Sequence, residues 1–279
     1  MIKVNLDRRG TGSPLVLLHG IGHRWQAWQP VLDLLAREHE VIALDLPGFG
    51  RSPDLPPDYT HDLAGTMRVL PELFRTLGVH RPHLAGNSMG GLIAVEAASH
   101  GLVRSATALS PAGFWTRRDR ARALATLRII RAGARAPGPV RALLVDNPRL
   151  RAATLRVLYA HPERIGRIEA IGDTDALRNS SAFNPAMRAG RRLVWSGPPP
   201  KVPITIAWGD QDHILLPRQA QRAARLLPEA RQIALPDCGH VPMIDNPELV
   251  ARTILDTCAK ADREAHPPSR TGRAAASGR

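Results

Sequence analysis

Ser88 lies in the stretch Gly86-Asn87-Ser88-Met89-Gly90, which places a hydroxyl between two glycines. The pattern Gly-x-Ser-x-Gly is typical of a serine held on a sharp turn between a strand and a helix, with its hydroxyl exposed at the end of a sheet. Such a turn strains the serine backbone and brings neighbouring segments close together, so the flanking residues must be small. The pattern predicts a nucleophilic serine, and the alternative is a turn that only packs a helix against a strand.

Three further polar groups follow apolar runs that have the character of buried strands: His19-Gly20, Asp210 or Asp212, and His240. Acyl transfer needs a nucleophile, a base that takes its proton, an acid that orients the base, and donors that stabilise the oxyanion. Because the carboxyl ends of parallel strands meet at one edge of a sheet, we expect these groups to gather around Ser88. The chain therefore carries a candidate for each component.

Strand-like and helix-like runs alternate in the two outer parts of the chain. This alternation favours an α/β fold with a mostly parallel central sheet and right-handed crossovers. The expected strands are residues 16–18, 41–44, 83–85, 103–109, 204–208 and 232–235, and the expected helices are residues 25–35, 60–77, 89–99, 217–227 and one that begins near 247.

The middle of the chain breaks this alternation. Residues 113–199 show amphipathic helical patterns and no strong strand run, so we expect a helical cap or lid inserted between two parts of one core, residues 1–112 and 200–260. The alternative is a helical layer packed on the flank of the sheet. Residues 261–279 are rich in alanine, arginine, serine and glycine, which predicts a disordered tail.

The net charge of +13 is concentrated in the middle segment. Residues 113–197 hold 17 arginines and six acidic residues, whereas only Lys3, Lys201 and Lys260 are lysines in the whole chain. This skew indicates a compositional bias toward arginine, and the alternative is a field that attracts anionic substrates or an anionic membrane surface. No zinc-finger spacing or aromatic-basic RNA motif is visible, so we expect no nucleic-acid partner.

Two cysteines, Cys238 and Cys258, are too few for a disulfide framework or a metal cluster, so we expect no metal. Cys238 lies close to His240, but a small buried residue is the better interpretation than a nucleophilic thiol. No apolar run reaches the roughly 18 residues that span a bilayer, and the start of the chain lacks a long apolar leader. We expect a cytoplasmic protein without a transmembrane segment, and without a dinucleotide or other cofactor.

These motifs, in this order, resemble the α/β-hydrolase family over residues 1–112 and 200–260. The motifs that carry the resemblance are His19-Gly20, Asp45-x-Pro47-Gly48-x-Gly50-x-Ser52, Gly86-x-Ser88-x-Gly90-Gly91, Gly209-x-x-Asp212 and Gly239-His240. The resemblance implies the α/β-hydrolase fold, a mostly parallel central sheet flanked by helices with a helical cap insertion. It also implies that His19 and Asp45 organise loops.

The resemblance assigns a role to each reactive group. Ser88 would attack the substrate carbonyl, and His240 would accept the serine proton and return it to the leaving group. Asp212 would hold His240 in the right tautomer, because it stands three residues after the strand-end glycine, a spacing that fits better than that of Asp210. The backbone N–H groups of Ile21 and Met89 would form the oxyanion hole.

The resemblance implies a cofactor-independent serine hydrolase that cleaves a carboxylic ester, thioester or lactone through an acyl-enzyme. Serine at position 88 disfavours dehalogenases and epoxide hydrolases, which use aspartate there, and Ile21 disfavours esterases with His-Gly-Gly-Gly. The turn sequence also resembles C–C bond hydrolases of aromatic ring-fission pathways, but those have tryptophan after the histidine, where this chain has Val241. That activity, a cofactor-free oxygenase or perhydrolase, and a non-catalytic small-molecule receptor are the alternatives.

An apolar pocket is expected beside these groups, with ordinary core packing as the alternative for each of its candidate residues. A small apolar or aromatic acyl substrate would suit it, and the arginine-bearing cap adds the hypothesis of an anionic end. The candidate lining residues, in addition to Ile21 and Met89, are Trp25, Phe114, Trp115, Ile214 and Val241. The sequence leaves the oligomeric state open.

Overall fold

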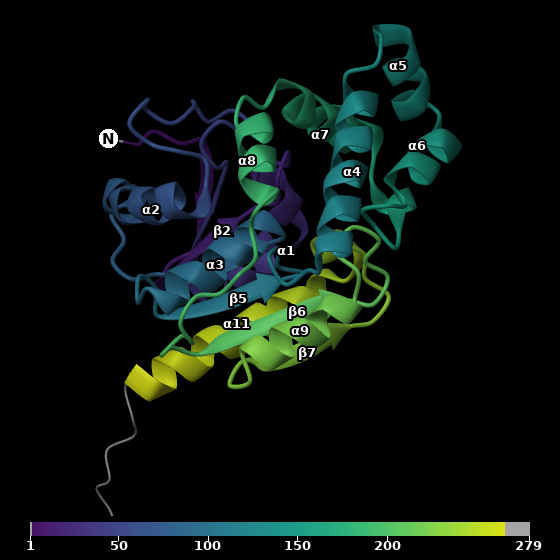
Figure 1. The fold of residues 1–279 in the computed structure, drawn as a ribbon. Coiled ribbons are helices and arrows are strands. Elements are labelled where there is room, and N and C mark those ends of the chain that lie inside the picture. The colour runs from purple at the N-terminus through teal and green to yellow at the C-terminus, as the bar shows by residue number, and fades with distance from the viewer. Residues whose placement is uncertain (1, 266–279) are drawn as a thin grey trace, which may run out of the picture.

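The computed structural model describes residues 2–265, and Figure 1 shows the course of the chain. Its centre is a sheet of seven strands in the order β1-β3-β2-β4-β5-β6-β7. All neighbouring strands run parallel except β1, which pairs antiparallel with β3. The strands are β1 Leu6–Arg9, β2 Ser13–Leu18, β3 His39–Leu44, β4 His83–Asn87, β5 Ser105–Leu109, β6 Ile204–Gly209 and β7 Arg231–Leu235.

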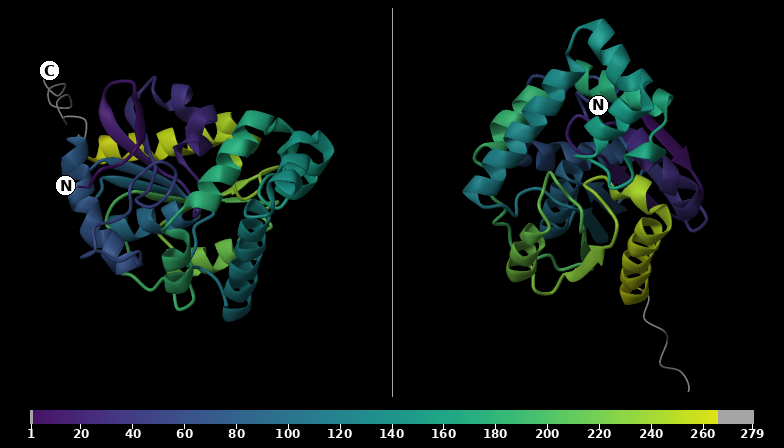
Figure 2. Two further views of the ribbon diagram at one scale, coloured as in Figure 1. Left: turned by 90° about the horizontal axis from the view of Figure 1, so that it is seen from above. Right: turned by 90° about the vertical axis from the view of Figure 1, so that its right-hand side faces the viewer.

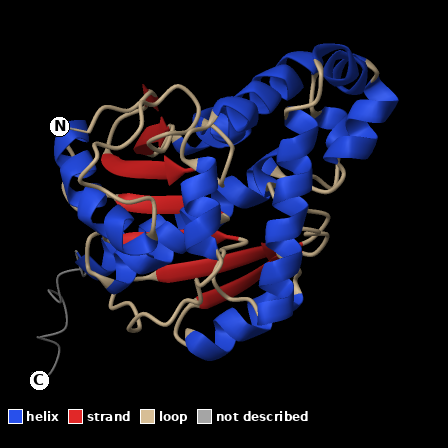
Figure 3. Cartoon of the chain, turned by 45° about the horizontal axis from the view of Figure 1, so that its top comes forward, coloured by secondary structure: helices blue, strands red, loops and turns tan. Residues whose placement is uncertain are grey.

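Helices cover both faces of the sheet, as the red strands enclosed by blue helices in Figure 3 show. One face packs against α1 and α11, and the other packs against α2, α3 and α9. The core helices are α1 Gln29–Leu35, α2 Leu63–Leu77, α3 Met89–Ser99, α9 Arg218–Leu226 and α11 Pro247–Ala265, with the short η1 Trp25–Trp28 before α1 and α10 Pro242–Asp245 before α11.

The central strands are buried on both faces, which explains why they are continuous apolar runs rather than alternating ones. In β2, Leu15 and Leu17 pack in the cluster with α1 and α11, while Val16 and Leu18 pack in the cluster with α2 and α3. All four side chains are fully buried. The sheet is therefore packed between two hydrophobic clusters, which hold the ends of its strands in place.

A helical insertion, residues 113–199, lies between β5 and β6, and its described residues contain no strand. Figure 1 and the right-hand view of Figure 2 show its helices above the sheet, on the opposite side of the molecule from α11. Its helices are α4 Arg117–Ala134, α5 Gly138–Asp146, α6 Pro148–Leu155, η2 Pro162–Arg164, α7 Arg167–Asn179 and α8 Phe183–Gly190.

The mostly parallel sheet and its flanking helices confirm the fold that the sequence motifs predicted. Helix α3 has the predicted bounds, whereas α2 begins at Leu63 rather than at residue 60. The reason is Asp62, whose side chain accepts a hydrogen bond of 2.7 Å from the N–H of Gly65 and so caps the helix. Strand β1 and helix α10 were not predicted.

The prediction of a tail from residue 261 is wrong at its start. Helix α11 continues to Ala265, and Ala261 is buried, one helical turn on from the buried Cys258. The apolar stripe of α11 therefore keeps contact with the core beyond Lys260. Residues 266–279, the rest of the predicted tail, lie outside the described residues.

The loop after β3 is organised around the carboxylate of Asp45, as the sequence predicted. Its Oδ1 accepts a hydrogen bond from the N–H of Trp25 at 2.7 Å, and its Oδ2 accepts from Asn5 Nδ2 at 2.7 Å and from the N–H of Arg51 at 2.9 Å. Gly50 packs directly on this carboxylate with a φ of 55°, so any β-carbon there would overlap it.

We expect Gly50→Ala to lower the free energy of unfolding by about 2–4 kcal/mol, because it adds an overlap with Asp45 to the strain of a positive φ. Gly78→Ala is the matched control, since Gly78 has a φ of 71° but no atom within 4 Å of the place a β-carbon would take, and should cost about 1–2 kcal/mol. Urea unfolding of the two variants measures the difference. Equal losses would show that the contact with Asp45 contributes nothing.

Candidate active site

Ser88 joins β4 to α3 in a backbone conformation that non-glycine residues rarely adopt, with φ 57° and ψ −112°. The strain is tolerated because the turn is held on both sides: the Ser88 N–H donates to the carbonyl of Leu109 at 2.9 Å, and the Ser88 carbonyl accepts from Ala112 at 3.0 Å. A β-carbon on Gly86 or Gly90 would overlap neighbouring backbone. The two glycines are therefore required sterically, as the motif predicted.

Asn87 connects the serine turn to the loop that carries His240. Its side-chain amide donates to the His240 carbonyl at 2.8 Å and to the Leu109 carbonyl at 3.3 Å. Asn87 is buried, so losing these bonds would leave an unpaired amide in the interior. This contact ties the serine turn to a loop that lies far along the chain, a role that no motif in the sequence indicated for Asn87.

His240 and Asp212 form a buried hydrogen-bonded pair. Nδ1 of His240 lies 2.8 Å from Oδ2 of Asp212, and both side chains are at most 5% exposed. The other carboxylate oxygen, Oδ1, accepts from the N–H groups of Ile214 and Leu215, each at 2.8 Å. Three donors thus fix the carboxylate, which in turn fixes the plane of the imidazole and leaves its Nε2 for a second partner.

The two candidate acids differ in their contact with His240. Asp212 contacts His240, whereas Asp210 is exposed on the surface. The hydrogen bonds of the described residues include none between the Ser88 hydroxyl and the His240 ring. Such bonds are often long before a substrate is bound, so the lack of one is compatible with a nucleophile and its base.

His19 is a structural residue rather than a second base. Its Nδ1 lies 2.7 Å from the Gly20 carbonyl and donates to it, while its Nε2 accepts from the N–H of Leu46 at 2.9 Å. Burial lowers the pKa of His19 to about 4, so the ring is neutral near pH 7 in the tautomer that these two bonds require. His19 thereby ties the loop after β2 to the loop after β3.

The two expected oxyanion donors lie at the ends of adjacent strands. Met89 is the first residue of α3, where backbone N–H groups have no acceptor within the helix. Ile21 lies inside a turn that the His23 N–H closes on the Gly20 carbonyl at 3.1 Å, and Gly20 approaches the Ser88 β-carbon. Both residues line the pocket that contains Ser88.

Asp245 is a further functional candidate that the sequence analysis missed. Its buried carboxylate accepts from the N–H of Gly239 at 2.8 Å, from Ala160 at 3.1 Å and from His161 at 2.8 Å. It therefore holds the residue before His240 and two residues of the insertion at once. The available signal was an acid five residues after the histidine, just before the Asn246-Pro247 start of a helix.

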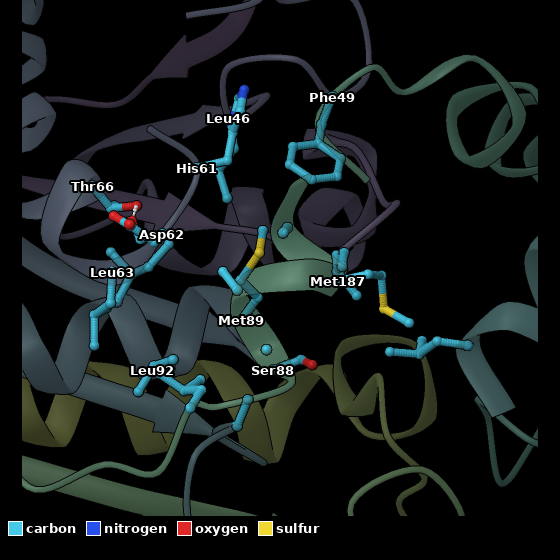
Figure 4. Close-up of a pocket in the computed structure, with 18 of the residues that line it drawn as sticks. Leu46, Phe49, His61, Asp62, Leu63, Thr66, Ser88, Met89, Leu92 and Met187 are labelled. Carbon is cyan, nitrogen blue, oxygen red and sulfur yellow. Dashed lines mark hydrogen bonds between the residues drawn. The ribbon is translucent and has the colours of Figure 1, made fainter. Parts of the chain in front are cut away.

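Ser88 lines an apolar pocket, which is called the Ser88 pocket below (Figure 4). Its wall is formed by α2, α3, α4, α8 and the loops after β3 and β6, and the polar side chains in it are Ser88, His61, Asp62 and Thr66. Neither arginine nor lysine lines it. The apolar side chains that face it include Phe49, Leu63, Leu92, Leu124, Met187 and Ile214.

The predicted pocket residues divide into two groups. Trp115 and Ile214 line the Ser88 pocket, whereas Trp25, Phe114 and Val241 do not. Phe114 is fully buried, with its ring centroid 5.4 Å from that of Trp195 and the two rings tilted by 37°. Trp25 and Val241 pack in the cluster with α1 and α11. Their neighbours in the sequence lie in the loops around Ser88 and His240, but their own side chains pack in the core.

The other reactive groups of the described chain do not compete with this site. Burial raises the pKa of the Cys238 thiol to about 12, so it is not a nucleophile near pH 7. Within residues 2–265 no three His, Cys, Asp or Glu side chains are grouped as metal ligands. In the same range, no helix combines the length and the apolar character that crossing a membrane requires.

Comparison with known proteins gives matches along most of the chain. A model of the alpha/beta hydrolase family matches residues 15–253. Lipase 3 of Moraxella sp. is 29% identical over 84% of this chain and 74% of its own length, and Lipase 1 of Psychrobacter immobilis is 30% identical over 84% and 73%. The crystal structure of a membrane phospholipase A superposes with a TM-score of 0.73 at 25% identity, covering 93% of this chain and 83% of that one.

We expect the buried neutral His19 to make folding pH-dependent. Its folded pKa of about 4 lies below its unfolded value of 6.5, so as the pH falls the unfolded chain binds the proton first. The contribution of His19 is complete above about pH 6.5 and is lost as the pH falls toward 4. His19→Gln should therefore lower the unfolding free energy by about 2 kcal/mol at pH 7 and by less at pH 4.5.

Urea unfolding at pH 7, 5.5 and 4.5 measures this change. His80→Gln is the matched control for the replacement itself, because His80 is exposed just before β4. A gap between wild type and His19→Gln that stays constant from pH 7 to 4.5 would contradict a neutral His19.

Proposed function

Because the chain belongs to the alpha/beta hydrolase family, we propose that it is a cofactor-independent serine hydrolase that cleaves carboxylic esters of apolar acids. One observation carries the proposal: the strained Ser88 faces an apolar pocket and is tied through Asn87 to a His240 that Asp212 orients. Two lipases among the relatives, at 29% and 30% identity, support ester cleavage as the reaction.

In the proposed mechanism the Ser88 hydroxyl attacks the ester carbonyl while Nε2 of His240 takes its proton. The tetrahedral oxyanion would accept hydrogen bonds from the backbone N–H groups of Ile21 and Met89. Collapse expels the alcohol, which receives the proton from His240 and leaves an acyl group on Ser88. Water, deprotonated by His240, then releases the acid, and Asp212 stabilises the imidazolium in both steps.

The lining of the Ser88 pocket favours an uncharged acyl group. The sequence raised the hypothesis of an anionic end, but no arginine or lysine reaches this pocket to pair with one. Arg131, a buried arginine of the insertion, instead lies 4.3 Å over the Phe183 ring and donates to Ser180, which gives it a structural role. We therefore propose an aliphatic or aromatic acyl group without a charge.

We further propose that the insertion acts as a cap that selects the substrate. Helices α4 and α8 place Leu124, Leu127 and Met187 in the wall of the Ser88 pocket, so the acyl group would lie between the insertion and α2 and α3. Burial of acyl chain against such a wall stabilises binding by about 0.8 kcal/mol for each methylene group.

We expect Ser88→Ala to lower kcat for p-nitrophenyl butyrate at least about 10⁴-fold and to abolish labelling by a fluorophosphonate. Asp212→Asn should lower kcat by about 10³- to 10⁴-fold, because the imidazole loses its orienting acceptor. Asp210→Asn is the matched control, two residues away and exposed, and should retain wild-type activity. Labelling of Ser88 without turnover of any ester would favour a receptor or an oxygenase instead.

Ala186→Phe should shorten the preferred acyl chain, because Ala186 lies on α8 in the wall of the Ser88 pocket. The ratio of kcat/KM for decanoate to butyrate esters is expected to fall at least about tenfold, the loss of two or more buried methylenes. Ala142→Phe, on the exposed side of α5 and outside this lining, is the control. An unchanged chain-length profile in Ala186→Phe would place the acyl group elsewhere.

A further inference from the structure

A second pocket with a mostly apolar lining lies inside the insertion and is called the insertion pocket below. Its charged side chains are Arg141, Arg151 and Asp173. Helices α4, α5, α6 and α7 form its wall, together with the loop after β2 from Ile21 to His23. Ile21 and Leu127 line both this pocket and the Ser88 pocket. The two pockets therefore meet at the residue whose backbone is the expected oxyanion donor.

The insertion pocket lies on the side of the catalytic histidine. The Leu158 carbonyl, from a residue of its wall, accepts a hydrogen bond from the Val241 N–H at 3.1 Å, and Gly239 packs on the backbone of residues 158–160. In ester cleavage the histidine must protonate the leaving oxygen, so the leaving alcohol departs on the histidine side. An ester carbonyl at Ser88 has two substituents, and this geometry gives each of them a pocket.

The inner end of the insertion pocket carries one buried hydroxyl with a hydrogen to donate. Nδ1 of His23 accepts a hydrogen bond from the Arg24 N–H at 3.1 Å, so the ring carries its proton on Nε2. Nε2 therefore donates to the hydroxyl oxygen of Tyr159, which lies 3.2 Å away. Tyr159 is 3% exposed, and its oxygen has no other partner among the described residues. Burial raises its pKa well above 10, so the group keeps its proton.

We propose that the insertion pocket binds the alcohol side of the ester substrate, an elongated apolar group, and that the Tyr159 hydroxyl donates a hydrogen bond to an oxygen carried by that group. The proposal rests on the ester hydrolysis proposed above and assigns the acyl group to the Ser88 pocket. The wall extends outward to Ile129, which is 72% exposed, so a longer alcohol chain can continue toward the surface. Tyr159 acts here as a specificity-determining residue.

Two series of esters separate the pockets: butyrates of alcohols from two to twelve carbons, and ethyl esters of acids over the same lengths. Thr174→Phe fills the insertion pocket, since Thr174 lines it from α7, and Ala186→Phe fills the Ser88 pocket. Thr174→Phe should lower kcat/KM for long alcohols at least about tenfold and change the acyl series less than about twofold. Ala186→Phe should do the reverse, and Ala142→Phe should alter neither series.

Tyr159→Phe tests the hydrogen bond while it keeps the shape of the side chain. The butyrate of 2-butoxyethanol, which carries an ether oxygen, is compared with the butyrate of heptanol, which has the same chain length without it. We expect wild type to favour the ether ester and Tyr159→Phe to lose that preference, by about five- to tenfold in kcat/KM. An equal effect on both esters would show that Tyr159 only supports the fold and would overturn its assignment.

Binding provides a readout that does not depend on turnover. In the Ser88→Ala background, calorimetry should show decanol binding that Thr174→Phe weakens at least about tenfold and Ala186→Phe leaves within about twofold. If Ser88-dependent hydrolysis is present but Thr174→Phe affects neither the alcohol series nor decanol binding, the insertion pocket is not the alcohol site. If no ester is hydrolysed, the proposed function itself fails, whereas decanol binding still reports on the pocket.

Discussion

The close approach of three backbone segments at the serine turn is the constraint on which the site depends. Gly86 and Gly90 let β4 and α3 meet, and Gly90 also lies against the Leu18 carbonyl at the end of β2. Because Ser88 hydrogen-bonds to Leu109 at the end of β5, the strained turn is fixed by β2, β4 and β5 together. The hydrophobic clusters on both faces hold these strands, so core packing maintains the backbone strain at Ser88.

Buried hydrogen bonds connect the serine turn and the loops around it to one another. His19 joins the loops after β2 and β3, Asp45 holds the second of these to η1, and Asn87 reaches the histidine loop. These groups are buried and paired, so moving any of the loops would expose an unpaired polar group. This network of His19, Asp45 and Asn87 holds the loops around Ser88 and His240, although none of its three members takes part in the proposed reaction.

The sequence predicted the parts of this arrangement that depend on local pattern. The buried strands are continuous apolar runs, and the serine turn has a motif whose residue types follow from its geometry, so both were recognised. Strand β1, Leu-Asp-Arg-Arg, was missed because it pairs on one side only and its side chains are mostly polar. Asn87 and Asp245 were missed because their side chains bond to backbone groups, most of which are far away in the sequence.

The sequence also did not predict the direction in which individual side chains point. Trp115 and Phe114 are adjacent in the sequence, yet Trp115 lines the Ser88 pocket and Phe114 packs against Trp195.

The carboxylate of Asp245, which binds two separate segments, constrains how the insertion can move. Because it accepts hydrogen bonds from residues 160 and 161 as well as from Gly239, it fixes that stretch of the insertion beside His240. Any movement of the insertion that leaves the backbone around His240 unchanged must therefore leave residues 160 and 161 in place.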